Sequence, residues 1–213
     1  MKLSEANAHF NSISNIPFGK LFSTTEMNDI IKNKGRSGQL LEIALGLANT
    51  NTVKDFEDGE LKTNKCNSNG DPLETIAITQ ISSHIEDLIA AVPFEKTWLY
   101  EKISNILYVP VCKEGKPEDW FFFPSIHINF CDKKYAEILN QLKKDYLYIC
   151  SEIKKTGELG KTLSTINGKY IQIRTKDSAP YHPIISLSYG KISDKNRAFY
   201  FKRDFITAIK KLS

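Results

Sequence analysis

The longest regular pattern in the sequence is an amphipathic stretch from Tyr135 to Lys155. Its apolar side chains recur at helical spacing, at Ile138, Leu142, Tyr146 and Ile149. A helix of this kind has one face that must be covered by another layer of structure. The patterns on either side of this stretch therefore decide what kind of fold the chain can adopt.

Strand patterns lie on both sides of this predicted helix. We expect strands near residues 59–64, 73–81, 103–112, 120–124, 169–175, 184–189 and 198–202. Further helices are expected within residues 1–34 and over 39–48, 84–91 and 204–212. Strands mixed with helices in this way are typical of an α/β fold, with a mixed sheet flanked by helices.

The composition fits a single globular domain spanning residues 1–213. A formal net charge of +4 permits nucleic-acid binding without requiring it. The four cysteines form no C-x-x-C pair and no Cys/His cluster with zinc spacing, which favours reduced thiols. No apolar run approaches the roughly 18 residues of a membrane span. We therefore expect a soluble cytoplasmic protein with no membrane partner.

The pattern D-x4-E-x-K, formed by Asp55, Glu60 and Lys62, carries the chemistry. Side chains alternate along a strand, so Glu60 and Lys62 should project on one side, and Asp55 can bend back toward it. Two carboxylates and the backbone carbonyl of Leu61 would supply hard oxygen ligands for Mg²⁺. The ammonium of the lysine would stand beside an attacking water, as phosphodiester hydrolysis requires.

Two features of this region have alternative interpretations. An E-x-K sequence is also a common charge pair on exposed strands, and Asp55 could simply occupy a turn. Glu42 is the only charge on the apolar segment from Gln39 to Ala48. It would either belong to the acidic site or face water on a narrow polar strip.

Blocks of sequence around this pattern resemble the MutH-like family. That family includes a DNA mismatch-repair nickase acting at hemimethylated GATC and restriction endonucleases of the Sau type. The similar blocks occur in order over most of residues 16–210, and the main ones are Lys34-Gly35, Leu40-Leu41-Glu42-Ile43, Glu60-Leu61-Lys62-Thr63, Ile106–Val111, Gly168–Lys176 and Phe199–Phe205.

The resemblance implies a role for each matched position. The implied catalytic residues are Asp55, Glu60, Lys62 and Glu42. The implied ligands of Mg²⁺ are Asp55, Glu60 and the backbone carbonyl of Leu61. The implied DNA-binding residues are Lys34, Lys102, Arg174, Lys176, Tyr200 and Lys202, with Tyr200 near the base step where methylation is sensed.

The C-terminal positions also have simpler interpretations. Arg174 and Lys176 alternate on a strand and could form one solvated face. Phe199 is expected to be a core aromatic residue rather than a DNA contact.

The resemblance also implies the fold in more detail. It predicts a restriction-endonuclease-like core of the PD-(D/E)XK type, with two lobes around a DNA cleft. A catalytic lobe would span about residues 1–150 and a recognition lobe about residues 151–213.

One departure from the family concerns the spacing of the metal ligands. Six residues usually separate the aspartate and the glutamate, whereas four separate Asp55 and Glu60. The shorter spacing is similar to that of the MvaI branch of restriction enzymes. It leaves open whether Asp58 replaces Asp55, although little chain would then remain for the return bend.

These features favour a type II restriction endonuclease that cuts double-stranded DNA, expected at GATC. Such an enzyme would be a monomer when free, could dimerise on DNA, and would have a cognate methyltransferase. The first alternative is a MutH-type mismatch-repair nickase at hemimethylated GATC. Two others are a non-catalytic DNA-binding module and a nuclease acting on RNA or single strands.

Overall fold

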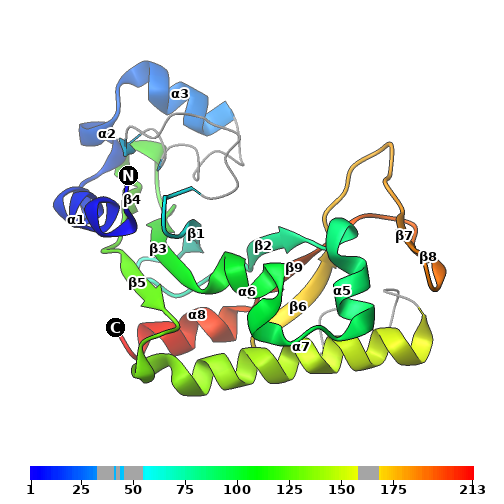
Figure 1. The fold of residues 1–213 in the computed structure, drawn as a ribbon. Coiled ribbons are helices and arrows are strands. Elements are labelled where there is room, and N and C mark those ends of the chain that lie inside the picture. Colours follow the sequence, from blue (N-terminus) through cyan, green and yellow to red (C-terminus); the bar gives the residue numbers. More distant parts are fainter. Residues whose placement is uncertain (33–40, 42–43, 46–54, 158–167) are drawn as a thin grey trace. The chain divides into compact units, whose positions relative to one another are not determined.

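The computed structural model describes residues 1–32, 41, 44–45, 55–157 and 168–213. The chain divides into two compact units. Unit 1 comprises Met1–Glu74, Ser104–Asn129 and Ser213, and unit 2 comprises Thr75–Ile103 and Phe130–Leu212. The element labels follow Figure 1.

Unit 1 is built around a mixed sheet. Its helical elements are α1 (Leu3–Ile13), α2 (Phe18–Leu21), α3 (Thr24–Lys32) and the 3-10 turn η3 (Pro117–Asp119). Its strands are β1 (Glu60–Cys66), β3 (Asn105–Cys112), β4 (Phe121–Phe122) and β5 (Ile126–Asn129). Strand β3 is central, because it pairs in parallel with β1 and in antiparallel with β4 and β5. The expected mixed α/β architecture is therefore confirmed.

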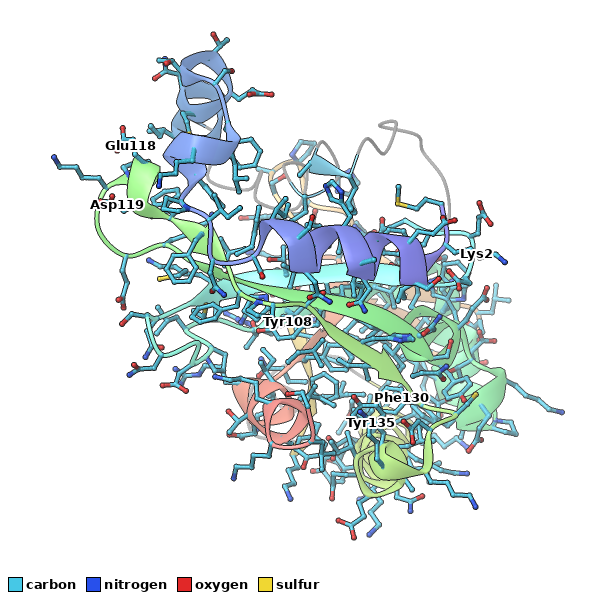
Figure 2. All side chains as sticks on the ribbon, turned by 90° about the vertical axis from the view of Figure 1, so that its left-hand side faces the viewer. Lys2, Tyr108, Glu118, Asp119, Phe130 and Tyr135 are labelled. Atoms are coloured by element: carbon cyan, nitrogen blue, oxygen red, sulfur yellow. The ribbon has the colours of Figure 1, made fainter. Side chains whose placement is uncertain are left out.

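The core of unit 1 lies between α1 and one face of this sheet, as Figure 2 shows. Leu3 and Phe10 of α1 pack in one buried cluster with Leu61, Leu107 and Val109 of the two central strands. Glu60, Lys62 and Tyr108 alternate with these residues and therefore belong to the opposite face. The polar residues of the catalytic pattern are thus on the face that α1 does not cover.

In its described residues, unit 2 combines a three-stranded antiparallel sheet with a hairpin and four helices. The sheet has the order β2-β9-β6, with β2 (Ile76–Gln80), β9 (Arg197–Phe201) and β6 (Ile171–Thr175). The hairpin consists of β7 (Ile184–Ser186) and β8 (Gly190–Ser193). The helices are α5 (Ile85–Ala90), α6 (Trp98–Ile103), α7 (Ala136–Thr156) and α8 (Arg203–Lys210). The 3-10 turns are η1 (Ser82–His84), η2 (Phe94–Lys96) and η4 (Lys133–Tyr135).

The long helix α7 organises unit 2, in agreement with the expectation from its periodicity. It buries Ile138, Leu142, Tyr146 and Ile149 and packs against α5 and β6. Figure 1 shows it running along the length of this unit. Among the described residues, no helix has both the length and the apolar character needed to cross a membrane.

The division into units differs from the expected boundary near residue 150. Strand β2 precedes the central strand of unit 1 in the sequence, yet it pairs with β9 near the C-terminus. Helix α7 belongs with these strands because its apolar face covers β6. Unit 2 is therefore assembled from two separated stretches of the chain.

Candidate active site

Strand β1 brings Glu60 and Lys62 together at its N-terminal end. Lys62 Nζ donates to Glu60 Oε2 at 2.8 Å. The Glu60 and Lys62 side chains are only 5% and 13% exposed, so this ion pair is largely shielded from water. An ion pair in this position is costly to desolvate and contributes little to stability by itself. A solvated surface charge pair, the simpler interpretation of E-x-K, does not describe this geometry.

Asp55 lies beside the same strand. Its Oδ2 accepts a hydrogen bond from the backbone N–H of Leu61 at 2.8 Å. Among the described residues, β1 pairs with β3 along one edge, and Leu61 uses its other edge for Asp55. The N–H and C=O groups of one residue face the same edge of a strand. The Leu61 carbonyl therefore faces the edge where the Asp55 carboxylate is held.

Asp58 is held by a different part of unit 1, which favours Asp55 as the residue beside β1. Its Oδ1 accepts from the backbone N–H of Leu3 at 2.8 Å, at the first turn of α1. Its backbone carbonyl accepts from Asn105 Nδ2 at 2.6 Å. The Asp58 carboxylate thus satisfies an otherwise unpaired N–H at the start of a helix, whereas Asp55 contacts the catalytic strand.

The donor set at this site suits a hard divalent cation. Asp55, Glu60 and the Leu61 carbonyl provide oxygen ligands of the kind that Mg²⁺ prefers. A carboxylate can accept more than one contact, so the bond from Leu61 leaves Asp55 with capacity for a metal. Within the part of the chain described by the structure, no three His, Cys, Asp or Glu side chains form a metal-binding group. The fourth acidic candidate, Glu42, lies outside the described residues.

A buried polar pair continues this face of the sheet beyond Lys62. Tyr108 Oη donates to Asn64 Oδ1 at 2.6 Å, and Asn64 Nδ2 donates to the Glu74 carbonyl at 3.1 Å. Burial raises the pKa of Tyr108 well above its usual range, so its hydroxyl stays neutral. Tyr108 is the cross-strand neighbour of Lys62 and lies on the side of β3 away from α1 (Figure 2). Tyr108 and Asn64 are therefore buried, neutral neighbours of Lys62 on this face of the sheet.

In unit 2, the structure brings together two of the expected DNA-binding residues. The Arg174 guanidinium lies 5.5 Å from the centre of the Tyr200 ring, and its Nη1 donates to Thr75 Oγ1 at 2.8 Å. Arg174 is exposed, whereas burial raises the pKa of the half-buried Tyr200 hydroxyl. Phe199 is buried in the core of unit 2, as the sequence predicts.

The expected lysines of unit 2 lie at different places. Lys176 is exposed and lines an open hollow of about 610 Å³ together with Asp177, His182 and other polar residues. Lys202 is partly buried, and its Nζ donates to the Gly168 carbonyl at 2.8 Å. Lys102 Nζ lies 5.0 Å from the centre of the Trp98 ring. Lys34 lies outside the described residues.

Sequence reasoning missed two polar residues that the strand pairing of unit 2 makes important. Asp145 of α7 is buried and accepts hydrogen bonds from the backbone N–H groups of Lys169, Tyr170 and Ile171. Gln172 of β6 is also buried and lies opposite Tyr200. The sequence held one signal for Gln172: it lies two residues before Arg174 and therefore on the same face of the strand.

No protein-family model matches the chain, whereas several curated proteins do. A protein of Haemophilus influenzae (strain PittEE), named DNA mismatch repair protein MutH, is 28% identical over 217 residues, covering 97% of this chain and 93% of that protein. The protein of the same name from Buchnera aphidicola subsp. Baizongia pistaciae is 28% identical over 203 residues, covering 87% of this chain and 84% of its own. The MutH protein of Vibrio cholerae is 27% identical over 211 residues, which cover 92% of this chain and 90% of that protein.

These similarities extend along nearly the whole length of both partners, and the relatives share one name. The chain is therefore similar to MutH proteins over most of its length.

Proposed function

We propose that this protein is a magnesium-dependent DNA endonuclease that nicks double-stranded DNA at hemimethylated GATC in mismatch repair. The observation that carries the proposal is the arrangement of Asp55, Glu60 and Lys62 around the first residues of β1. The shared name of the relatives supports a repair role for this chain. The sequence alone favoured a type II restriction endonuclease, but the relatives favour the repair nickase.

The metal would be held by Asp55, Glu60 and the backbone carbonyl of Leu61. When bound, Mg²⁺ supplies neutralisation of the scissile phosphate and acidification of a coordinated water. Asp55 is already oriented for binding, because its hydrogen bond from Leu61 fixes the carboxylate against the strand. A ligand that is held in place before binding loses little conformational freedom when the metal arrives.

Lys62 would act on the phosphate and on the attacking water. Its ammonium is held at 2.8 Å from Glu60 and is largely shielded from solvent. A charge in such surroundings interacts with a phosphate oxygen more strongly than it would in water. The ion pair also keeps the ammonium on the face of the sheet where Asp55 and Glu60 can share one ion.

The fold that we propose is a restriction-endonuclease-like core of the PD-(D/E)XK type. The parallel pairing of β1 with β3 and the antiparallel additions to β3 are consistent with it. The residues that we propose as contacts for duplex DNA are Arg174, Lys176, Tyr200, Lys202, Lys34 and Lys102.

The experiment compares cleavage of a short GATC duplex with that of a scrambled duplex, in Mg²⁺ and in EDTA. Wild-type protein should cleave only the GATC duplex and only with the metal. Lys62→Ala should lower the cleavage rate by at least about 100-fold, the scale expected when one charged transition-state contact is removed. Lys65→Ala is the matched control, since Lys65 is exposed on the same strand and points to the other face.

Normal cleavage by Lys62→Ala, with Lys65→Ala also active, would remove the proposed mechanism. Cleavage that persists in EDTA would remove the metal from it. Binding of the GATC duplex without any cleavage would instead favour a non-catalytic DNA-binding module.

A further inference from the structure

The sheet of unit 2 has one apolar face and one mixed face. Ile173, Phe199 and Phe201 point into the core on the apolar face. Residues opposite each other in an antiparallel pair project on the same side, as do residues two apart on one strand. Gln172 is paired with Tyr200, and Arg174 follows on the same strand. These three side chains therefore share the mixed face.

The Gln172 carboxamide is the unusual member of this group. Gln172 is 6% exposed, and within the described residues its side chain makes no hydrogen bond. Among the described residues, Trp120 Nε1 is the one fully buried side-chain N or O atom without a hydrogen-bond partner. The amide atoms of Gln172 therefore keep some access to solvent, and a ligand can reach them from the mixed face.

Small side chains lie across the strands from the other two members of this group. Tyr200 has Ala77 as its neighbour on the other strand, and Arg174 has Ala198 opposite it. The Arg174 guanidinium, 5.5 Å from the centre of the Tyr200 ring, adds a positive charge to the same face.

We propose that Gln172 is a specificity-determining residue whose carboxamide pairs with the edge of an adenine base beside Tyr200. This inference rests on the function proposed above and names a residue that reads the target. A carboxamide is complementary to adenine, because its oxygen accepts from the N6 amino group while its N–H donates to N7. Each strand of GATC contains one adenine, so the base would supply the two partners that the amide lacks among the described residues.

The test combines three duplexes with three proteins. One duplex contains natural GATC, a second has 7-deazaadenine in place of adenine, and a third has purine, which lacks the N6 amino group. The proteins are wild type, Gln172→Met and Gln80→Met. Gln80 is the matched control because it lies in the same sheet and already accepts from Asn196 Nδ2 at 3.0 Å.

Wild-type kcat/KM should fall about 5- to 100-fold on either analogue, the range expected for a bidentate base contact. Gln172→Met should lose a similar factor on natural GATC and lose nothing further on the analogues. Gln80→Met should keep the full sensitivity of the wild type to both analogues. A merely structural role of Gln172 would lower the rate on every duplex and leave the analogue sensitivity intact, which would overturn the inference.

A second variant separates the two contacts. Gln172→Glu retains an acceptor for N6 and lacks the donor for N7. Its kcat/KM should therefore fall on the purine duplex and stay unchanged on the 7-deazaadenine duplex. If this variant lost kcat/KM on both analogues as the wild type does, the proposed pairing with adenine would be wrong. Thermal unfolding of each variant shows that it is folded, and Gln172→Met should unfold no earlier than wild type because it removes an unpaired amide.

Failure of the inference and failure of the proposed function give different results. If the wild type cleaves GATC and tolerates both analogues, only the reading of adenine by Gln172 is wrong. If the wild type neither binds nor cleaves the GATC duplex, the proposed function and this inference both fall.

Discussion

Asp55 and Asp58 precede the catalytic strand and are held by different parts of the molecule. The Leu61 N–H holds the carboxylate of Asp55, and the Leu3 N–H holds that of Asp58. One aspartate therefore belongs to the edge of β1 and the other to the start of α1. Their different partners lead to opposite expectations for two otherwise similar substitutions.

Asp58→Ala should lower the free energy of unfolding by about 1 kcal/mol, the usual effect of losing a side-chain acceptor at a helix start. It should leave metal-dependent cleavage intact. Asp55→Ala should abolish that cleavage because a proposed metal ligand is lost. Urea denaturation and cleavage rates measured on both variants check these outcomes, and the reverse pattern would make Asp58 the ligand.

The pairing of Glu60 with Lys62 could be predicted from sequence because its geometry is local. Alternation along one strand is enough to place Glu60 and Lys62 on the same side. Gln172 could not be found in this way, since its neighbour Tyr200 reaches it only through the pairing of β6 with β9. Lys202 was identified through the family resemblance. Its hydrogen bond from Nζ to the Gly168 carbonyl could not be predicted, because it depends on the tertiary fold.

At the scale of elements, α7 holds the beginning of β6 through a single side chain. Both oxygens of Asp145 accept backbone N–H groups of the segment from Lys169 to Ile171, and Gln141 Nε2 donates to Oδ1 at 2.8 Å. Hydrogen bonds from backbone N–H groups to an ionised carboxylate are stronger than those between neutral groups. The strand that carries Gln172 and Arg174 is therefore positioned by the long helix.

Asp145→Ala should leave these backbone donors buried without a partner and cost on the order of 3 kcal/mol in unfolding free energy. Urea denaturation measures this loss. A matched substitution, Asn140→Ala at an exposed position of α7, should change the stability by less than about 0.5 kcal/mol. A similarly small effect of Asp145→Ala would show that the helix does not hold the strand.

Elements with a strong period agreed with the structure, whereas two short elements differed from it. Helix α7 and strand β3 were predicted because their apolar patterns are long. The strand expected to reach residue 189 ends at Ser186, where Ser186 Oγ accepts from Ser188 N at 3.1 Å and turns the chain into β8. Helix α6 was missed, although Thr97 Oγ1 accepts from Tyr100 N at 3.1 Å at its start.

At the scale of the whole molecule, the chain builds two units by leaving unit 1 after Glu74 and returning to it at Ser104. A boundary of this kind is hard to predict from sequence, because it depends on long-range pairing of β2 with β9. The net charge of +4 is small for a protein of 213 residues. The proposed binding to DNA would therefore depend on where the cations lie more than on their excess.

Lys202→Met tests one of these cations. Its ammonium has three N–H donors, and the bond to Gly168 uses one of them, so a phosphate contact remains possible in geometry. Neutralising it should weaken binding to all duplexes and reduce the slope of log K against log salt by about 0.9. Fluorescence anisotropy over a salt series, with Ca²⁺ to prevent cleavage, measures the slope, and an unchanged slope would exclude Lys202 from the interface.

Nicking of one strand at hemimethylated GATC can be measured directly. The measurement uses a plasmid with a single GATC site that is unmethylated, hemimethylated or fully methylated, incubated with Mg²⁺, with the cleaved strand mapped at nucleotide resolution. The hemimethylated plasmid should convert slowly to nicked circles, with the break at GATC in the unmethylated strand. Rapid linearisation of the unmethylated plasmid would identify a restriction endonuclease instead, and breaks at unrelated sequences would contradict GATC as the target.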